Sequence, residues 1–217
     1  GVESVKIVDI ISTSLIDYPK HISCVIFTQG CNMTCDYCHN KEFMNSERLK
    51  DEKTIMEFLK CRKNVLDGVV ISGGEPTLQK DLPDFCRKIK ELTNLKIKID
   101  TNGTNPKMLM WLIEEKLIDY IAMDIKAPKE KYKLLTGIDY NHIEDSIRIV
   151  KMFNGEFRTT VFPLLSEEDI IKIHEISKPK QLYLQQFVPT RTCNIKPYDS
   201  EFILNISKKL GCEVRGL

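Results

Sequence analysis

The sequence predicts an α/β protein in which a strand followed by a helix is repeated about six times. Two observations carry this prediction. Short apolar runs rich in Val, Ile, Phe and Tyr have the length and composition of strands, and amphipathic helical segments separate them. This alternation implies parallel strands joined by right-handed crossovers. The strands can close partly into a barrel or lie open as a doubly wound sheet, and either architecture places chemistry at their carboxyl ends.

The predicted strands begin with an edge strand over residues 5–11. Several of the later runs are apolar throughout rather than alternating, which is typical of a sheet covered on one or both faces. These strands of the repeats lie at residues 22–27, 69–72, 97–101, 120–125, 158–162 and 182–188.

Helices are predicted where apolar residues recur at positions i, i+3, i+4 and i+7. The clearest helix covers residues 82–92, where Leu82, Phe85 and Ile89 share one face. Pro106 occupies the first-turn position of a helix that continues through residues 108–113. The remaining helices are expected around residues 55–59, 143–150, 167–177 and 199–211.

Length and composition bound the class of protein. The chain has 217 residues, with 32 basic and 31 acidic side chains and a formal net charge of +1, so no charge excess indicates a nucleic-acid partner. Ten glycines and nine prolines are ordinary numbers, which excludes collagen-like and disordered chains. Because no repeat, linker or low-complexity segment is visible, we expect one domain over residues 1–217, with a core of about 14–189.

Eight cysteines are the unusual feature of the composition. Three of them fall within eight residues, unlike the spread of a secreted disulfide scaffold. The N-terminal segment has no basic region followed by an apolar one, and no apolar run approaches the ~20 residues that span a bilayer. We therefore expect a cytoplasmic protein with no membrane partner, with reduced thiols and a metal or redox site.

Three further cysteines, Cys24, Cys61 and Cys86, lie within apolar strand or helix faces and are expected to be small buried residues. Trp111 is likewise expected to take part in helix packing. The basic tract of residues 126–133 is typical of a solvated face, although it also suits an acidic partner.

The loop after the first full strand carries Cys31, Cys35 and Cys38 at C-x3-C-x2-C spacing. Three thiolates suit zinc or an iron–sulfur cluster. A Cys3His zinc site would use His39, whose place directly after Cys38 makes joint ligation of one ion awkward, and no second C-x2-C pair is present. A four-cysteine cluster would need a distant ligand such as Cys193. The third possibility is a cluster with one iron left open for a ligand from outside the protein.

Paired glycines end the second of the repeated strands. Gly73 and Gly74 allow the backbone to approach a ligand closely, and Glu75 follows them. A plain turn between a strand and a helix explains the same residues, so this motif is weak by itself.

Hydroxyl and carboxylate oxygens end the next two strands, at Asp100, Thr101 and Asp124. These groups are ligands that a hard cation prefers, whereas Asn102 belongs to an Asn-Gly turn signal. Lys126 can pair with a neighbouring aspartate or with a ligand carboxylate. Salt-bridged or solvated strand ends explain each residue taken alone.

The last two strands add Arg158 and the pair Gln185 and Gln186. Because side chains alternate along a strand, only one of the two glutamines is expected to face the interior.

In these motifs the chain resembles the radical S-adenosylmethionine (SAM) superfamily. The cysteine spacing, with Tyr37 before the last cysteine, looks like the signature of that superfamily. The D-T-N-G and D-x-K stretches resemble the SAM-binding strand ends of glycyl-radical-enzyme activases. The S-L-I-D-Y-P segment that starts at Ser14, with His39 and Asn40, is similar to the anaerobic ribonucleoside-triphosphate reductase activating proteins. Lys20 departs from their pattern, because members commonly have glycine there.

The resemblance implies a partial (βα)6 TIM-type barrel and a radical SAM enzyme. Cys31, Cys35 and Cys38 would hold a [4Fe–4S] cluster whose open iron is chelated by the amino and carboxylate groups of SAM. Reductive cleavage of SAM would give methionine and a 5′-deoxyadenosyl radical that abstracts a hydrogen atom, while the protein binds, orients and excludes water.

The resemblance also implies which residues bind the cofactors, and a monovalent cation is expected near Asp100, Thr101 and Asp124. The expected cofactor-binding residues are Tyr37, Asn40, Gly73, Gly74, Glu75, Asp100, Thr101, Asn102, Asp124, Lys126, Arg158 and Gln186.

For an activase of this kind, the hydrogen atom would come from a backbone glycine of a glycyl-radical enzyme, here an anaerobic ribonucleotide reductase. A low-potential electron donor such as flavodoxin or ferredoxin would supply the electron. One alternative is a radical SAM enzyme acting on a small molecule or peptide, in the manner of the carboxy-deazaguanine synthases, and a more distant one is a non-catalytic metal-binding module. Small-molecule enzymes of this fold often carry substrate-binding insertions, and this chain is nearly all core, which favours a protein substrate.

Overall fold

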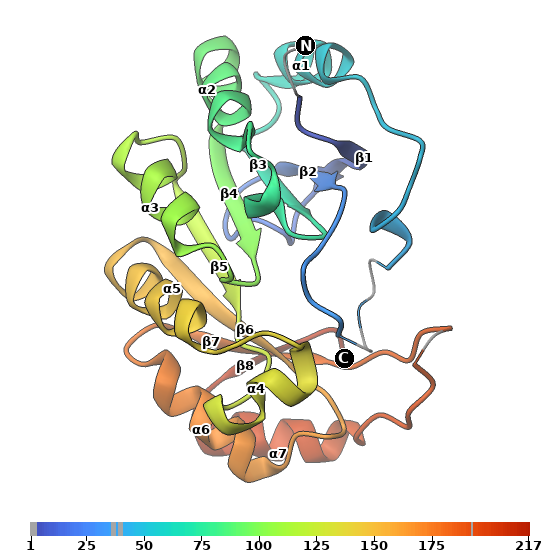
Figure 1. The fold of residues 1–217 in the computed structure, drawn as a ribbon, viewed down its shortest axis with the longest axis vertical. Coiled ribbons are helices and arrows are strands. Elements are labelled where there is room, and N and C mark those ends of the chain that lie inside the picture. The colour runs from blue at the N-terminus through green and yellow to red at the C-terminus, as the bar shows by residue number, and fades with distance from the viewer. Residues whose placement is uncertain (1–3, 36–37, 39–40, 192) are drawn as a thin grey trace. The chain divides into compact units, whose positions relative to one another are not determined.

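Eight strands form one mostly parallel sheet in the computed structural model, which describes residues 4–35, 38, 41–191 and 193–217 (Figure 1). The strand order follows the chain from β1 to β8. Strand β1 is antiparallel to β2, whereas the pairs β2–β3, β3–β4, β6–β7 and β7–β8 are parallel. The strands are β1 (Ile7–Ser14), β2 (Ser23–Thr28), β3 (Gly68–Gly73), β4 (Lys96–Thr101), β5 (Tyr120–Asp124), β6 (Gly155–Val161), β7 (Leu182–Gln186) and β8 (Glu213–Arg215).

Helices alternate with these strands, as the sequence predicts. Pro106 occupies the first turn of its helix, and the Asn105 side chain accepts a hydrogen bond from the Met108 amide at 3.2 Å. The helices are α1 (Glu52–Arg62), α2 (Leu82–Thr93), α3 (Pro106–Glu114), α4 (Lys129–Thr136), α5 (Asn141–Met152), α6 (Glu167–Ser177) and α7 (Ser200–Leu210), with short 3-10 helices η1 (Lys41–Phe43) and η2 (Pro76–Leu78).

The chain divides into two compact units. The first comprises residues 1–32, 40–101 and 105–121, and the second comprises residues 33–39, 102–104 and 122–217. Each unit is described below by itself.

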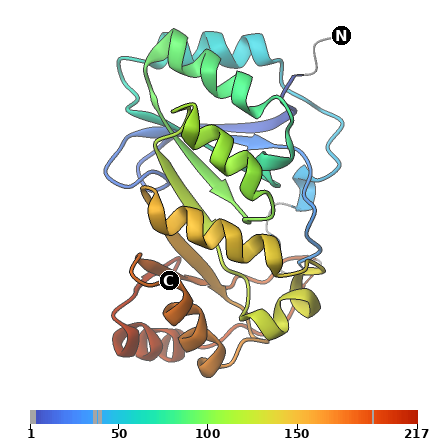
Figure 2. The same ribbon diagram turned by 60° about the vertical axis from the view of Figure 1, so that its left-hand side comes forward.

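The first unit packs helices α1 and α2 side by side (Figure 2). Asp51 caps α1 by accepting a hydrogen bond from the Thr54 amide at 3.0 Å. A buried cluster of Tyr18, Val25 and Val70 lies between β2, β3 and the loop after β1. The apolar faces of β2 and β3 therefore meet the loop after β1 in one buried core.

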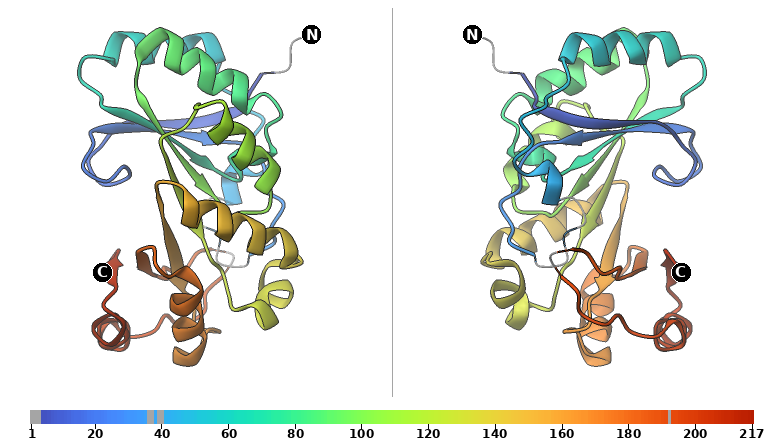
Figure 3. Two further views of the ribbon diagram at one scale, coloured as in Figure 1. Left: turned by 90° about the vertical axis from the view of Figure 1, so that its left-hand side faces the viewer. Right: turned by 90° about the vertical axis from the view of Figure 1, so that its right-hand side faces the viewer.

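The second unit packs α6 against β6 and α7 against β7 and β8 (Figure 3). A capping box begins α6, because Ser166 and Asp169 exchange side-chain and backbone hydrogen bonds. Arg215 on β8 forms a two-pronged ion pair with the buried carboxylate of Glu156, and its guanidinium lies 3.6 Å from the ring centre of Tyr183. These contacts fix the last strand to the sheet.

Besides the two short 3-10 helices, one strand and one α-helix were missed by the sequence patterns. Strand β8 has only three residues, which is too short to show periodicity. Helix α4 lies in the basic tract of residues 126–133 and beyond, and it has two buried residues, Tyr132 and Thr136. Gly137, in the left-handed conformation, ends this helix.

Two burial predictions were wrong. Cys61 is exposed, because it lies at the last turn of α1 away from the buried Ile55, Met56 and Leu59. Trp111 is 45% exposed, and its indole nitrogen donates a hydrogen bond to the Glu115 carboxylate at 3.0 Å. Cys24 and Cys86 are fully buried, as predicted.

Candidate functional site

The cysteine loop begins directly after β2. Gly30 has a φ of 87°, a left-handed conformation that glycine adopts without strain, and the chain turns there into Cys31. In the second unit the amide of Cys38 donates to the carbonyl of Cys35 at 3.2 Å, and the amide of Thr34 donates to the carbonyl of Thr136 at 3.2 Å. The loop is therefore turned tightly between its last two cysteines and tied to the end of α4.

All eight cysteines of the chain are free thiols. Within the described residues, no group of three or more His, Cys, Asp or Glu side chains is gathered closely enough to hold a metal ion. Cys193 is buried in a turn where its backbone exchanges hydrogen bonds with Thr190. Tyr37 and Asn40, both predicted to bind cofactor, lie outside the described residues, as does His39.

The paired glycines after β3 are required by the backbone itself. Gly73 has a φ of 119°, and a Cβ there would collide with the backbone of Thr28. A Cβ on Gly74 would collide with the carbonyl of Gly30, and the Glu75 amide donates a hydrogen bond to that same carbonyl at 2.7 Å. The turn after β3 and the residue before Cys31 are thus in direct backbone contact, which no residue but glycine at position 74 permits.

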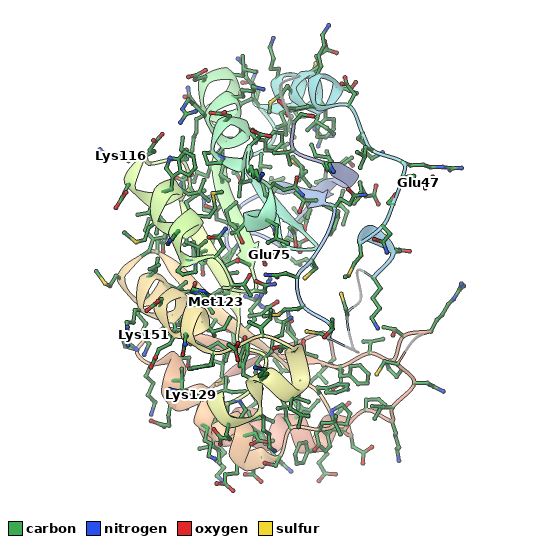
Figure 4. All side chains as sticks on the ribbon, viewed as in Figure 1. Glu47, Glu75, Lys116, Met123, Lys129 and Lys151 are labelled. Carbon is green, nitrogen blue, oxygen red and sulfur yellow. The ribbon has the colours of Figure 1, made fainter. Side chains whose placement is uncertain are left out.

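Glu75, labelled in Figure 4, is fully buried and bridges η2 and the end of β4. Its Oε1 atom accepts hydrogen bonds from the Thr77 amide at 3.2 Å, the Thr77 hydroxyl at 2.6 Å and the Thr101 hydroxyl at 2.7 Å. Burial of a carboxylate is costly unless such donors surround it. The Glu75 carboxylate therefore fixes η2 and the end of β4 relative to each other.

Asp100 pairs with a buried lysine that the sequence motifs did not single out. Lys98 Nζ lies 2.9 Å from Asp100 Oδ1 and 2.6 Å from the carbonyl of Asp17. The side chain of Lys98 is 2% exposed, so its charge is compensated within the first unit. The sequence signal that could have predicted this ion pair is a lysine two residues before an aspartate in an otherwise apolar strand, because such residues share one face.

The Ser14–Pro19 segment lies far along β2 from the cysteines. Ser14 is paired with Ser23 at the start of β2, whereas Cys31 follows the end of that strand. The Ser14 hydroxyl hydrogen-bonds the Asp17 carboxylate, and Lys98 binds the Asp17 carbonyl. In this structure the segment packs around Tyr18 at the amino-terminal ends of the strands, away from the cysteine loop.

Asn102 forms a local turn in the second unit. Its Oδ1 accepts from the Thr104 amide at 3.1 Å and from the Thr104 hydroxyl at 2.8 Å. Gly103 has a φ of 77°, and its carbonyl accepts a hydrogen bond from Ser146 at 2.6 Å. The Asn-Gly turn expected from the sequence is therefore present.

Asp124 lies between two cationic side chains at the end of β5. Its Oδ1 accepts from Arg158 Nε at 3.1 Å, and its Oδ2 lies 3.3 Å from Lys126 Nζ. The Lys126 amide donates in turn to the Tyr132 hydroxyl at 3.4 Å. The Asp124 carboxylate therefore orients both cationic side chains.

The two glutamines of β7 lie on opposite faces. Gln185 pairs with Thr160, and Gln186 pairs with the buried Val161. Gln185 therefore shares a face with Arg158, whereas the Gln186 amide donates to the carbonyls of Phe187 and Tyr198, both at 3.3 Å. The Gln186 Oε1 atom is buried without a hydrogen-bond partner. Gln185 is thus the glutamine on the face of Arg158, whereas the resemblance assigned Gln186 to cofactor binding.

These features define a class of protein: an α/β sheet with thiols, paired glycines and charged residues after successive strands, which is the layout of a cofactor-dependent enzyme. The chain belongs to the Radical SAM superfamily, whose family model matches residues 25–176. Membership implies a [4Fe–4S] cluster and SAM as cofactors. The donor set fits them, because Cys31, Cys35 and Cys38 are free thiols in one loop. Among the described residues, no helix has the length and apolar character needed to cross a membrane.

Two curated relatives match nearly the whole chain. A Methanocaldococcus jannaschii protein, named "Putative glycyl-radical enzyme activating enzyme", is 42% identical over 89% of this chain and 82% of its own length. The "Pyruvate formate-lyase-activating enzyme" of Clostridium pasteurianum is 31% identical over 94% of this chain and 89% of its own length.

The fold is also that of solved radical SAM structures. The crystal structure of Streptococcus suis SuiB bound to S-adenosylmethionine matches with a TM-score of 0.65 and 20% sequence identity, over 84% of this chain and 44% of that chain. The chain thus spans less than half of that structure, and the likeness is one of fold.

Proposed function

We propose that this protein activates a glycyl-radical enzyme by reductive cleavage of SAM, and that its partner is an anaerobic ribonucleotide reductase. The observation that carries the proposal is the 42% identity to the M. jannaschii relative across most of both chains, together with that relative's name. The C. pasteurianum relative, also named as an activating enzyme, supports the same class of partner. The reductase in particular rests on the Ser14–Pro19 segment. We assign the reaction to the cytoplasm and to a single radical SAM domain.

Each group of strand-end residues has a role in this proposal. Cys31, Cys35 and Cys38 hold the [4Fe–4S] cluster. When bound, the cluster supplies the electron that cleaves SAM to methionine and a radical able to take a hydrogen atom from glycine. The Gly73–Gly74 turn presents backbone groups to the SAM amino group, and Glu75 keeps that turn rigid through Thr77 and Thr101.

The charged residues of the second unit bind the anionic end of SAM. Arg158 and Lys126 are held by Asp124 and provide donors for a carboxylate. We add Gln185, on the same face as Arg158, as a further SAM contact. Tyr37, Asn40, Asn102 and Gln186 remain part of the proposed cofactor-binding set.

A monovalent cation near Asp100, Thr101 and Asp124 completes the proposal. Lys98 already pairs with Asp100, and Lys126 pairs with Asp124. A bound cation would therefore share each carboxylate with a lysine. We expect K⁺ or Na⁺ to tighten SAM binding relative to a bulky organic cation. Equal SAM affinity in all of these salts would contradict the proposal of a bound cation.

The test is anaerobic reconstitution with iron and sulfide, followed by assay with SAM, a reductant and a candidate reductase. We expect about four iron atoms per chain, formation of 5′-deoxyadenosine, and a glycyl doublet in the EPR spectrum that requires the reductase. Cys35→Ala is expected to lose iron and SAM cleavage, while Cys61→Ala, which removes an exposed thiol, keeps both. SAM cleavage without a glycyl doublet on any cognate enzyme would favour a small-molecule or peptide substrate instead.

A further inference from the structure

Helix α4 contacts two segments that carry residues of the proposed SAM site. Tyr132 and Thr136 lie four residues apart on one face of the helix, and both are fully buried. The Tyr132 hydroxyl reaches the segment after β5, and the Thr136 carbonyl reaches the cysteine loop. Every residue of these contacts belongs to the second unit. One short helix therefore touches the loop of the cluster thiols and the strand end of the cationic side chains.

The Tyr132 hydroxyl holds the backbone at Lys126. It accepts a hydrogen bond from the Lys126 amide at 3.4 Å, while Lys126 Nζ lies 3.3 Å from Asp124 Oδ2. The ring of Tyr132 packs edge-on against Tyr140, with the two ring centres 5.3 Å apart. Because the ring is buried and packed, its hydroxyl has a fixed place. The backbone that carries Lys126 is fixed with it.

The carboxyl end of α4 holds the cysteine loop. The Thr136 carbonyl accepts hydrogen bonds from the Thr34 amide at 3.2 Å and from the Thr34 hydroxyl at 3.4 Å. The Thr136 hydroxyl donates in turn to the Tyr132 carbonyl at 2.6 Å. Thr34 directly precedes Cys35, which is 5% exposed and whose carbonyl accepts from the Cys38 amide. The part of the loop that carries these two cysteines is therefore attached to the helix.

Gly137 leaves room for this attachment. Its φ of 77° lies in the left-handed region, and its amide donates to the Lys133 carbonyl at 2.9 Å. A Cβ at this position would lie 3.0 Å from the Thr34 hydroxyl oxygen, which would have to move. Gly211 ends α7 with a φ of 67°, and a Cβ there would meet nothing within 4 Å. The two glycines share one backbone conformation, but of the two it is Gly137 that borders the cysteine loop.

We propose that Tyr132 is a positioning residue of the SAM site, and that α4 fixes the place of Cys35 and Cys38 relative to Lys126. The inference rests on the proposed function, in which SAM is bound both by the cluster at the cysteine loop and by the cation of Lys126. A molecule held at two places binds more tightly when their spacing is fixed in advance. Tyr132 contributes to both contacts, through its hydroxyl to Lys126 and through its carbonyl to Thr136.

The first experiment removes the hydroxyl of Tyr132 and keeps its buried ring. We expect Tyr132→Phe to raise the KM for SAM about fivefold in dithionite-driven cleavage, with less than about a twofold change in kcat. Isothermal titration calorimetry of the reconstituted variant should show the same loss of SAM affinity without turnover. Tyr140→Phe, which removes the hydroxyl of the neighbouring ring, is the matched control and should leave KM, kcat and affinity unchanged.

The second experiment loosens the cysteine loop in the cluster-free chain. Gly137→Ala should raise the rate at which iodoacetamide modifies Cys35 about fivefold, because the displaced Thr34 holds the loop less firmly. Gly211→Ala places the same methyl group in the same backbone conformation at the end of α7 and should leave the rate unchanged. Tyr132→Phe keeps its carbonyl and should also leave it unchanged. Peptide mass spectrometry measures all three rates.

Two results would overturn the inference. One is a KM and a SAM affinity of Tyr132→Phe equal to those of Tyr140→Phe, or a loss confined to kcat, which would separate Tyr132 from SAM positioning. The other is a Cys35 modification rate in Gly137→Ala equal to that in Gly211→Ala, which would detach the loop from α4. Urea midpoints establish that the compared variants are folded.

Failure of the proposed function gives a different pattern. Neither experiment contains a glycyl-radical enzyme, so a wrong partner leaves both results interpretable. A chain that binds neither cluster nor SAM would contradict the proposed function in its parent form. The modification of Cys35 needs no cofactor and would still show whether α4 holds the cysteine loop.

Discussion

Thr101, at the carboxyl end of β4, donates its hydroxyl hydrogen bond to the buried carboxylate of Glu75 at a distance of 2.7 Å. Thr77 donates to the same oxygen through both its amide and its hydroxyl. Hydrogen bonds to a charged acceptor stabilise a fold more than neutral ones do. This relationship joins the glycine turn to the next strand, so the geometry proposed for SAM binding depends on two hydroxyl groups outside the cysteine loop.

Thr101→Val removes one of these donors while keeping the β-branched shape of the side chain. We expect the free energy of unfolding of the cluster-free protein to fall by about 2 kcal/mol, because the Glu75 carboxylate loses a hydrogen bond in a buried place. Urea denaturation measures the change. Thr101→Ser, which retains the hydroxyl, is the matched control and should recover most of the loss; equal stability of the valine variant would show that the bond contributes nothing.

Lys98→Met removes the buried cation that faces Asp100 and the Asp17 carbonyl. We expect a loss of about 3 kcal/mol, because breaking a buried ion pair leaves its partner charge poorly compensated. Lys88→Met breaks the more exposed pair with Glu52 and should cost less than about 1 kcal/mol. Urea denaturation of both variants is the measurement, and equal losses would contradict the structural role of Lys98.

Asp124→Asn removes the charge that orients Arg158 and Lys126. We expect SAM to bind the reconstituted variant about tenfold more weakly, because both cations lose a charge-assisted partner. Isothermal titration calorimetry with SAM is the measurement. Asp145→Asn, which breaks the exposed pair with Arg148 at 3.2 Å, is the control and should bind SAM as the parent does. Unchanged affinity in Asp124→Asn would remove Asp124 from the site.

Burial raises the pKa of the Cys24 and Cys86 thiols to about 12. Because the thiolate is the reactive form, iodoacetamide at pH 8 should modify the exposed Cys61 and leave Cys24 and Cys86 unmodified in the native chain. Peptide mass spectrometry, with urea-unfolded protein as the control, measures this. Modification of Cys24 at the rate of Cys61 would contradict the burial.

The same pKa shifts give a pH dependence of stability. In the unfolded chain a cysteine titrates near pH 8.5, below the native value, so the unfolded state loses its proton first. The contribution of each buried thiol is therefore fully present below about pH 8.5 and is lost as the pH rises toward 12. Urea midpoints measured from pH 7 to pH 10 should fall more steeply for the parent than for Cys86→Ala.

Much of the fold follows from local sequence patterns. The helix predicted at residues 167–177 has those bounds, because Ser166 and Asp169 form a capping box ahead of a regular apolar pattern. Strand β4 likewise covers the apolar run that ends in Thr101. Strand β8 escapes such reasoning, because Arg215 is fixed by Glu156, which is distant in the sequence.

The candidate site is less readable from sequence than the fold. Motif spacing singled out Glu75, but not Thr77, whose importance depends on the fold bringing its hydroxyl to a buried carboxylate. The choice between Gln185 and Gln186 depends on strand register against β6. Lys98 reads as an ordinary polar position in a strand until its burial is seen.

The backbone contact between Gly74 and Gly30 makes two segments move as one. The Glu75 amide is bonded to the Gly30 carbonyl, and a Cβ at position 74 has no room. A ligand that shifts the turn after β3 is therefore expected to shift the start of the cysteine loop as well. A shift at Cys31 is expected to move the turn in the same way, because the contact is between backbone atoms. The rate at which the Glu75 amide hydrogen exchanges with deuterium therefore reports how firmly the turn after β3 is held to the start of the cysteine loop.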